Sequence, residues 1–82
     1  MPMIANQPAA RQLNPNKLLL SKWTAVDPVD REKHFIVTRL IAPDLPDTRV
    51  EMVQIEALYS GRSVNMPWRA LCDASVWRQG WL

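Results

Sequence analysis

One stretch decides the fold of this 82-residue chain: RVEMVQIEALYSGRSVNMPW, which spans Arg49–Trp68. Ser60 and Gly61 supply a two-residue turn in its middle, since glycine tolerates the positive φ that such hairpin turns require. This turn places apolar side chains opposite one another on one face, pairing Ala57 with Val64, Ile55 with Met66 and Val53 with Trp68. The other face is mostly polar, pairing Leu58 with Ser63 and Glu56 with Asn65. Shifting one strand by a single residue would mix the two faces, so the pattern predicts this hairpin in this register.

The clearest single strand precedes the hairpin, in KHFIVTRLI at Lys33–Ile41, which is rich in β-branched residues. Strict alternation puts apolar side chains on both of its faces, with Phe35, Val37 and Ile41 on one and Ile36 and Leu40 on the other. Such a strand is typical of one covered on two sides or curled within a small barrel. Polar loops are expected around it: DPVDREK, where Pro28 breaks the ladder, and APDLPDT.

Short helical turns and one extended segment are predicted at the two ends of the folded part. An Asn-Pro pair is a helix-start signal, so we expect a turn near Pro15–Leu20, followed by an extended segment near Lys22–Val26. Pro67 ends the hairpin strand, and the WRAL that follows has room for one helical turn. Asp73 can cap a second short helix, ASVWRQ, which Gly80 ends.

Together these elements predict a mainly β domain, either a small antiparallel sheet or an SH3-like open barrel, with short helical turns. The alternative is an α+β domain, in which a three-stranded antiparallel sheet carries the C-terminal helix on one face. We expect residues 1–12 to form a flexible N-terminal tail and residues 13–82 a single small globular domain. In so small a domain, the four tryptophans should supply much of the buried surface.

Composition argues against several protein classes. Cys72 is the only cysteine, so the chain forms no internal disulfide and suits a reducing compartment. The first residues lack the apolar run of a secretory signal, and no apolar run approaches the length of a membrane span. We therefore expect a soluble, cytoplasmic protein without membrane contact. The net charge of +2 permits an anionic partner without requiring one.

Residues suited to catalysis are few, so we expect no enzyme activity, no cofactor and no bound metal. His34 is the only histidine, which excludes a multi-histidine metal site, and neither of the two glycines belongs to a phosphate-binding loop. A nucleophilic dyad of Cys72 and His34 is conceivable from composition alone. The simpler interpretation makes Cys72 a small buried apolar residue and His34 a strand residue with a hydrogen-bond partner.

Nucleic-acid binding is the functional hypothesis with the clearest physical basis. Small barrels often stack bases on aromatic side chains while arginine and lysine contact the phosphates. The candidate ligand-binding residues for RNA or single-stranded DNA are Lys22, Arg69, Trp77, Arg78 and Trp81. A structural interpretation competes with it, in which the arginines cover the indoles as cation–π partners and the last two tryptophans fold the C-terminus back over the sheet.

The second functional hypothesis is a protein-interaction module. An exposed sheet edge or an aromatic patch left uncovered by the fold could accept a peptide or a second copy of the chain. Homodimerisation would also add buried surface to a small core. Both hypotheses describe a non-catalytic binding domain, and the residues alone leave the choice between them open.

The chain also resembles a family of small tryptophan-rich bacterial proteins of uncharacterised function. The resemblance extends over about residues 14–81 and rests on a KLLxSKWTA segment, a KHFxVT strand, a PWRxL corner and a closing W…GW. These motifs match Lys17–Ala25, Lys33–Thr38, Pro67–Leu71, Trp77, Gly80 and Trp81. The resemblance implies a stand-alone cytoplasmic domain, and it implies no activity.

Overall fold

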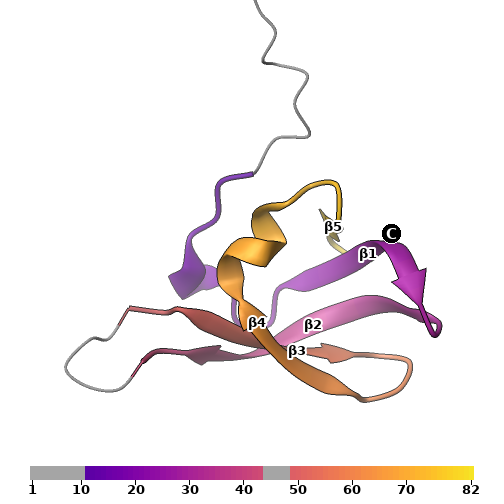
Figure 1. Cartoon of the computed structure of the whole chain (residues 1–82), viewed down its shortest axis with the longest axis horizontal. Coiled ribbons are helices and arrows are strands. Elements are labelled where there is room, and N and C mark those ends of the chain that lie inside the picture. Colours follow the sequence, from indigo (N-terminus) through magenta and orange to yellow (C-terminus); the bar gives the residue numbers. More distant parts are fainter. Residues whose placement is uncertain (1–10, 44–48) are drawn as a thin grey trace, which may run out of the picture.

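A computed structural model describes residues 11–43 and 49–82, which form one five-stranded antiparallel sheet and two short 3-10 helices (Figure 1). In chain order the elements are η2 (Pro15–Lys17), β1 (Lys22–Val29), β2 (Glu32–Ile41), β3 (Met52–Ala57), β4 (Ser63–Pro67), η3 (Trp68–Cys72) and β5 (Trp77–Gln79). The strand order is β4-β3-β2-β1-β5. The predicted mainly β fold is confirmed, whereas the α+β alternative is wrong because the expected C-terminal helix is a turn followed by β5, which pairs with β1.

The β1–β2 hairpin is longer than predicted, because the segment DPVDREK forms strand ends and a tight turn. Asp30 and Arg31 both have positive φ angles, 55° and 65°, which is the backbone of a two-residue hairpin turn. Pro28 lies within β1, so the predicted loop is wrong here, but no residue between Thr24 and Val29 pairs with β2, so the predicted break in the ladder at Pro28 is confirmed. The β1–β2 register shifts between Thr24 and Val29, and in this irregular stretch the ladder tolerates a residue without an N–H.

A bulge in β2 decides which of its apolar residues reach the core. Val37 pairs with Ile55, but the register then shifts, so that Leu40 pairs with Val53. The extra residue places Leu40 on the same face as Val37, where it packs against the core. Strict alternation had put Leu40 on the opposite face, together with Ile36. The predicted face of Leu40 is therefore wrong, and the same bulge moves Ile41 to the face away from the core.

The predicted β3–β4 hairpin is confirmed, but its register differs by two residues. Val53 pairs with Met66 and Ile55 with Val64, and the connection is the four residues 58–61, not two. Because the shift is even, the same side chains stay on the core face. The predicted pairing of Val53 with Trp68 is wrong, since Trp68 lies beyond the strand as the first residue of η3.

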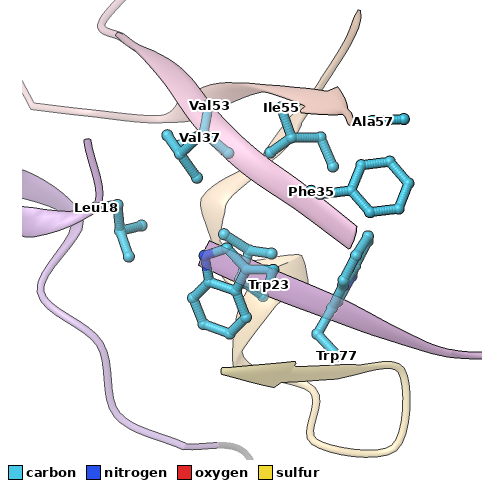
Figure 2. Packing of buried hydrophobic residues seen from close by; sticks show 9 residues of the cluster. Leu18, Trp23, Phe35, Val37, Val53, Ile55, Ala57 and Trp77 are labelled. Carbon is cyan, nitrogen blue, oxygen red and sulfur yellow. The ribbon is translucent and has the colours of Figure 1, made fainter. Parts of the chain in front are cut away.

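The core gathers on one face of the sheet (Figure 2). Trp23 and Ile55 are almost fully buried, and Phe35 meets the edge of Trp77, with ring centroids 5.1 Å apart and an interplanar angle of 89°. The buried apolar residues are Leu18, Trp23, Phe35, Val37, Val53, Ile55, Ala57, Leu71 and Trp77. Two tryptophans therefore supply the largest side chains of this core, as expected for a domain of this size.

The N-terminal segment and η3 cover this face of the sheet together (Figure 1). Arg11 joins them: its N–H donates to the Cys72 carbonyl at 2.8 Å, and its guanidinium donates to the carbonyls of Leu71 and Trp77. The same guanidinium lies 5.3 Å from the Trp23 ring centroid. Most of the predicted tail, residues 1–10, lies outside the described residues, and within the described part the chain is bound to the fold from Arg11 onward.

Candidate functional site

The opposite face of the sheet carries a tryptophan near the β1–β5 edge. Lys22 and Thr24 of β1 alternate with the buried Trp23, so their side chains point away from the core. His34 pairs with Thr24 across β1 and β2, and Arg78 pairs with Thr24 across β1 and β5, which puts both on this face. Gly80 follows with a φ of +85°, and the last residues then cross back over β1. This φ favours glycine.

Four hydrogen bonds hold the last residues against this face. The Trp81 Nε1–H donates to the Phe35 carbonyl at 2.9 Å, while the Thr24 hydroxyl donates to the Gly80 carbonyl at 2.6 Å and accepts from the Leu82 N–H at 3.0 Å. The fourth joins the His34 Nε2 to the Leu82 carbonyl oxygen at 2.9 Å. Trp81 nevertheless keeps 40% of its surface exposed. The indole is therefore held in position and remains open to solvent.

One cationic side chain lies over this indole, and two more line a hollow beside the last residues of the chain. The Lys22 ammonium lies 4.7 Å from the Trp81 ring centroid, and the His34 ring lies 6.3 Å from it at an angle of 53°. Lys33 and Arg78 line an adjoining hollow of about 220 Å³. The side chains of these two residues and of Lys22 make no hydrogen bond or ion pair with any residue in the ranges 11–43 and 49–82. We call this region the Trp81 surface; it consists of Lys22, Lys33, His34, Arg78, Trp81 and Leu82.

The five residues predicted as ligand contacts separate into three places. Lys22, Arg78 and Trp81 come together on the Trp81 surface. Trp77 is only 7% exposed and packs on Phe35 in the core, so its ring offers no stacking face. Arg69 belongs to η3, which covers the other face of the sheet. The predicted folding of the C-terminus back over the sheet thus holds for Trp81 and not for Trp77.

Three residues of the Trp81 surface were missing from the predicted site: Lys33, His34 and Leu82. Lys33 and His34 had been assigned to a strand, and His34 was expected only to satisfy a hydrogen bond, which it does with Leu82. Their neighbours on this surface come from β1 and from the last residues of the chain. What would have identified these residues is the strand pairing, which places His34 opposite Thr24. This pairing cannot be deduced from the spacing of residues along the chain.

The predicted cation–π cover is confirmed for one arginine. The Arg69 guanidinium lies 4.8 Å from the ring centroid of its neighbour Trp68. Over Trp81, the cation is Lys22 and not Arg78. Arg69 makes no hydrogen bond or ion pair with any residue that the structure describes. Each of these tryptophans therefore has a cation beside it, on opposite sides of the sheet.

A buried carboxylate joins the tips of the two hairpins. Glu32 accepts hydrogen bonds from the Arg62 guanidinium and, at 2.6 Å, from the Ser60 hydroxyl. These bonds, from Arg62 first and then from Ser60, lower the pKa of Glu32 from its ordinary value of 4.5 to about 2. The same pairing raises the pKa of Arg62. Because each charge satisfies the other, this pair serves the structure and leaves no free charge for a ligand.

The structure does not bring the two residues of the conceivable nucleophilic dyad together. His34 lies on the Trp81 surface, whereas Cys72 ends η3 over the core face, so the sheet separates them. Among residues 11–43 and 49–82, no group of three or more His, Cys, Asp and Glu side chains could hold a metal ion. In the same part of the chain, no helix has the length and apolar character needed to cross a membrane.

Comparison with known proteins identifies one family. Its model, described as "Tryptophan-rich protein (DUF2389)", matches residues 21–82 of this chain, which include every strand and the whole Trp81 surface. The match begins after η2, so Arg11 and the N-terminal segment that covers the core lie outside it. No curated protein and no solved structure matches the chain.

Proposed function

Since the chain belongs to this tryptophan-rich family, we propose a function from its own geometry: a non-catalytic domain that binds single-stranded nucleic acid on the Trp81 surface. A base stacks on Trp81, and Lys22, Lys33 and Arg78 contact the phosphates on either side of it. The observation that carries this proposal is the position of Trp81, an exposed indole held by a hydrogen bond near cations that have no carboxylate partner among the residues that the structure describes.

Pre-organisation of the aromatic ring supports this proposal. A base that stacks on an aromatic side chain contributes about 1–3 kcal/mol, and the contact tolerates every base. The Trp81 side chain is already held by its bond to the Phe35 carbonyl, so little side-chain entropy is lost when a ligand binds. The flat face of a base is accessible only where the strand is unpaired, which favours single strands over duplexes.

Charge supports the same ligand. Lys22, Lys33 and Arg78 carry three positive charges, and no acidic side chain lines the hollow between Lys33 and Arg78 among the residues that the structure describes. Arginine and lysine without ion-pair partners can contact phosphate without first breaking an internal bond. The neutralised Glu32–Arg62 pair lies at the hairpin tips and does not compete.

Finer features of the protein are part of the same proposal. The sheet is an SH3-like open barrel, which is supported by β5 pairing with β1 and by a 3-10 helix between β4 and β5. The protein acts in the cytoplasm without catalysing a reaction, which fits its single cysteine and the separation of Cys72 from His34.

Fluorescence anisotropy with a labelled oligouridine of about 12 nucleotides tests the function. We expect salt-dependent binding, with a log–log slope near −2 if three phosphates are contacted. Trp81→Ala should weaken binding about 5- to 100-fold, because it removes the stacking contact, and Trp81→Phe should restore much of it. The double variant Lys22→Ala, Arg78→Ala should reduce both the affinity and the salt slope.

Lys17→Ala is the matched control, since Lys17 is an exposed cation in η2, on the other side of the sheet. It should bind like the unaltered protein. Circular dichroism of each variant shows whether the fold is kept. Absence of binding at low salt, or equal binding by the Trp81→Ala and Lys17→Ala variants, would exclude the proposed function.

A further inference from the structure

A second hollow lies on the side of the sheet away from the Trp81 surface, between the N-terminal segment and η3. Its volume is about 440 Å³, and it is lined by Arg11, Gln12, Leu13, Trp68, Arg69 and Cys72. This volume is within the range of small-molecule sites, about 300–1,000 Å³. The bond from the Arg11 N–H to the Cys72 carbonyl, together with the two bonds of the Arg11 guanidinium, holds the two walls at a set separation.

The walls of this hollow have the chemistry of an aromatic site. Leu13 and Trp68 are half-buried and pack against the core, so their remaining exposed surface forms an apolar wall. Gln12 adds an amide that can both donate and accept hydrogen bonds. A flat apolar group with polar edges matches such a wall better than an aliphatic chain or a hydrated ion does.

The charge of this hollow favours an anion. Arg11 and Arg69 carry two positive charges, and no acidic side chain lines the hollow among the described residues. The Arg11 guanidinium is committed to two carbonyls, whereas Arg69 lies over the face of Trp68 and donates no hydrogen bond to any residue that the structure describes. The neighbouring Asp73 accepts hydrogen bonds from the Ser75 hydroxyl and N–H, which, together with the charge of Arg11, lower its pKa. Its negative charge therefore offsets part of the charge of Arg11, and Arg69 is the cation left for the ligand.

A third hollow, on the other side of the Trp68–Arg69 pair, differs from it in size and in charge. It is smaller, about 210 Å³, and Glu51 lines it beside the two arginines Arg49 and Arg69. An acidic side chain in the wall disfavours an anionic ligand. The hollow between Leu13 and Cys72 is therefore the better anion site of the two.

We propose that the hollow lined by Leu13, Trp68 and Arg69 binds a planar aromatic anion of nucleotide size. The ring lies against Leu13 and the part of the Trp68 indole that the Arg69 guanidinium leaves exposed, and its phosphate or carboxylate takes the free donors of Arg69. This site shares no residue with the Trp81 surface, so it stands whether or not that surface binds nucleic acid.

Titration of the full chain with adenosine monophosphate, followed by two-dimensional NMR, tests the site. The indole N–H signals of Trp68 and Trp81 can be followed separately once the variants Trp68→Phe and Trp81→Phe have each identified one of the four tryptophan signals. We expect the Trp68 signal to shift on addition of the nucleotide, while the Trp81 signal stays in place at low occupancy. Arg69→Ala should weaken binding about 10-fold or more, because a charge-assisted contact is lost.

Two partial ligands separate the ring from the charge. Adenosine and inorganic phosphate should each bind more weakly than the monophosphate, since each makes half of the contacts. Equal binding of adenosine would refute the anion requirement, and equal binding of phosphate would refute the aromatic one. Benzoate, a planar anion with a carboxylate in place of the phosphate, tests whether Arg69 also binds a carboxylate.

Arg78→Ala provides the matched control, because it removes an arginine from the Trp81 surface and leaves the hollow intact. It should leave monophosphate binding unchanged while weakening oligouridine binding. The opposite pattern, with Arg69→Ala silent and Arg78→Ala effective, would show that the nucleotide binds on the Trp81 surface, and would overturn this site while supporting the proposed function. No shift at millimolar nucleotide would also overturn it.

Discussion

Trp77 and Trp81 lie four residues apart in the chain, yet they occupy opposite faces of the same sheet. Trp77 is 7% exposed and packs edge-on against Phe35, whereas Trp81 is 40% exposed and bonds to the Phe35 carbonyl from the other side. In a helix, residues at this spacing would share a face. Here β5 lasts only three residues and Gly80 turns the chain, so the two indoles acquire different roles.

This comparison shows that residue type does not separate core from surface in a small tryptophan-rich domain. Both indoles contact the same aromatic residue of β2. What differs is whether other elements cover them: the N-terminal segment and η3 close over the core face, whereas on the opposite face near β5 the last residues are the only cover that the described part of the chain provides. Coverage therefore decides which aromatic ring can meet a ligand.

The largest expected effect tests this difference directly. Trp77→Ala should lower the free energy of unfolding by about 3–5 kcal/mol, because it leaves a large cavity beside Phe35. Trp81→Ala should lower it by about 1 kcal/mol, since a single hydrogen bond and a half-exposed contact are lost. Urea denaturation followed by circular dichroism measures both. Equal losses for the two variants would contradict the assignment of Trp77 to the core and Trp81 to the surface.

A smaller effect concerns the cover of the core face. Arg11→Ala should lower the free energy of unfolding by about 2 kcal/mol, because it removes two charge-assisted hydrogen bonds to the carbonyls of Leu71 and Trp77. The Trp23 indole should also become more accessible to a neutral fluorescence quencher. Lys17→Ala, in the same segment but without such bonds, should change neither property. A stable Arg11→Ala variant with Trp23 still protected would show that the segment covers the core without Arg11.

The last effect is a pH dependence at the hairpin tips, where Glu32 and Arg62 line a hollow beside Trp77. The pKa of Glu32 is about 2 in the folded protein and 4.5 ordinarily, so the carboxylate favours folding above pH 4.5. This contribution should be lost progressively as the pH falls from about 4.5 to about 2, and the melting temperature should fall with it. Carboxyl NMR titration measures the pKa of Glu32, which Arg62→Ala should raise. A normal Glu32 pKa in the unaltered protein would contradict the pairing.

Local sequence was sufficient to predict the strand at Lys33–Ile41 and the hairpin of Arg49–Trp68. The strand was predicted from its β-branched residues, and the hairpin from apolar residues that recur with the period of a strand. The register of that hairpin was predicted two residues away from the observed one. Its four-residue loop includes Ser60 and is followed by Arg62, both of which bind Glu32 of another hairpin, and no local rule contains that contact.

The elements that the sequence did not predict depend on strand partners that are distant in the chain. The turn at Asp30–Arg31 has positive φ angles without a glycine, so its sequence lacks the usual turn signal. Strand β5 is three residues long and exists only because β1 pairs with it. For the candidate site, the sequence pointed to Lys22, Arg78 and Trp81, but the exclusion of Trp77 and Arg69 and the inclusion of Lys33 required the fold.

The sequence by itself determined that this is a small, mainly β domain whose tryptophans matter, because the alternation of apolar residues and the placement of prolines and glycines act locally. Tertiary structure decided which tryptophans became core, which cations surround Trp81, and that a hollow forms between Leu13 and Cys72. The physical reason is that register, bulges and coverage depend on contacts between residues up to 66 positions apart, such as Arg11 with Trp77. The sequence around Arg11 and the sequence around Trp77, each taken separately, do not predict such a contact.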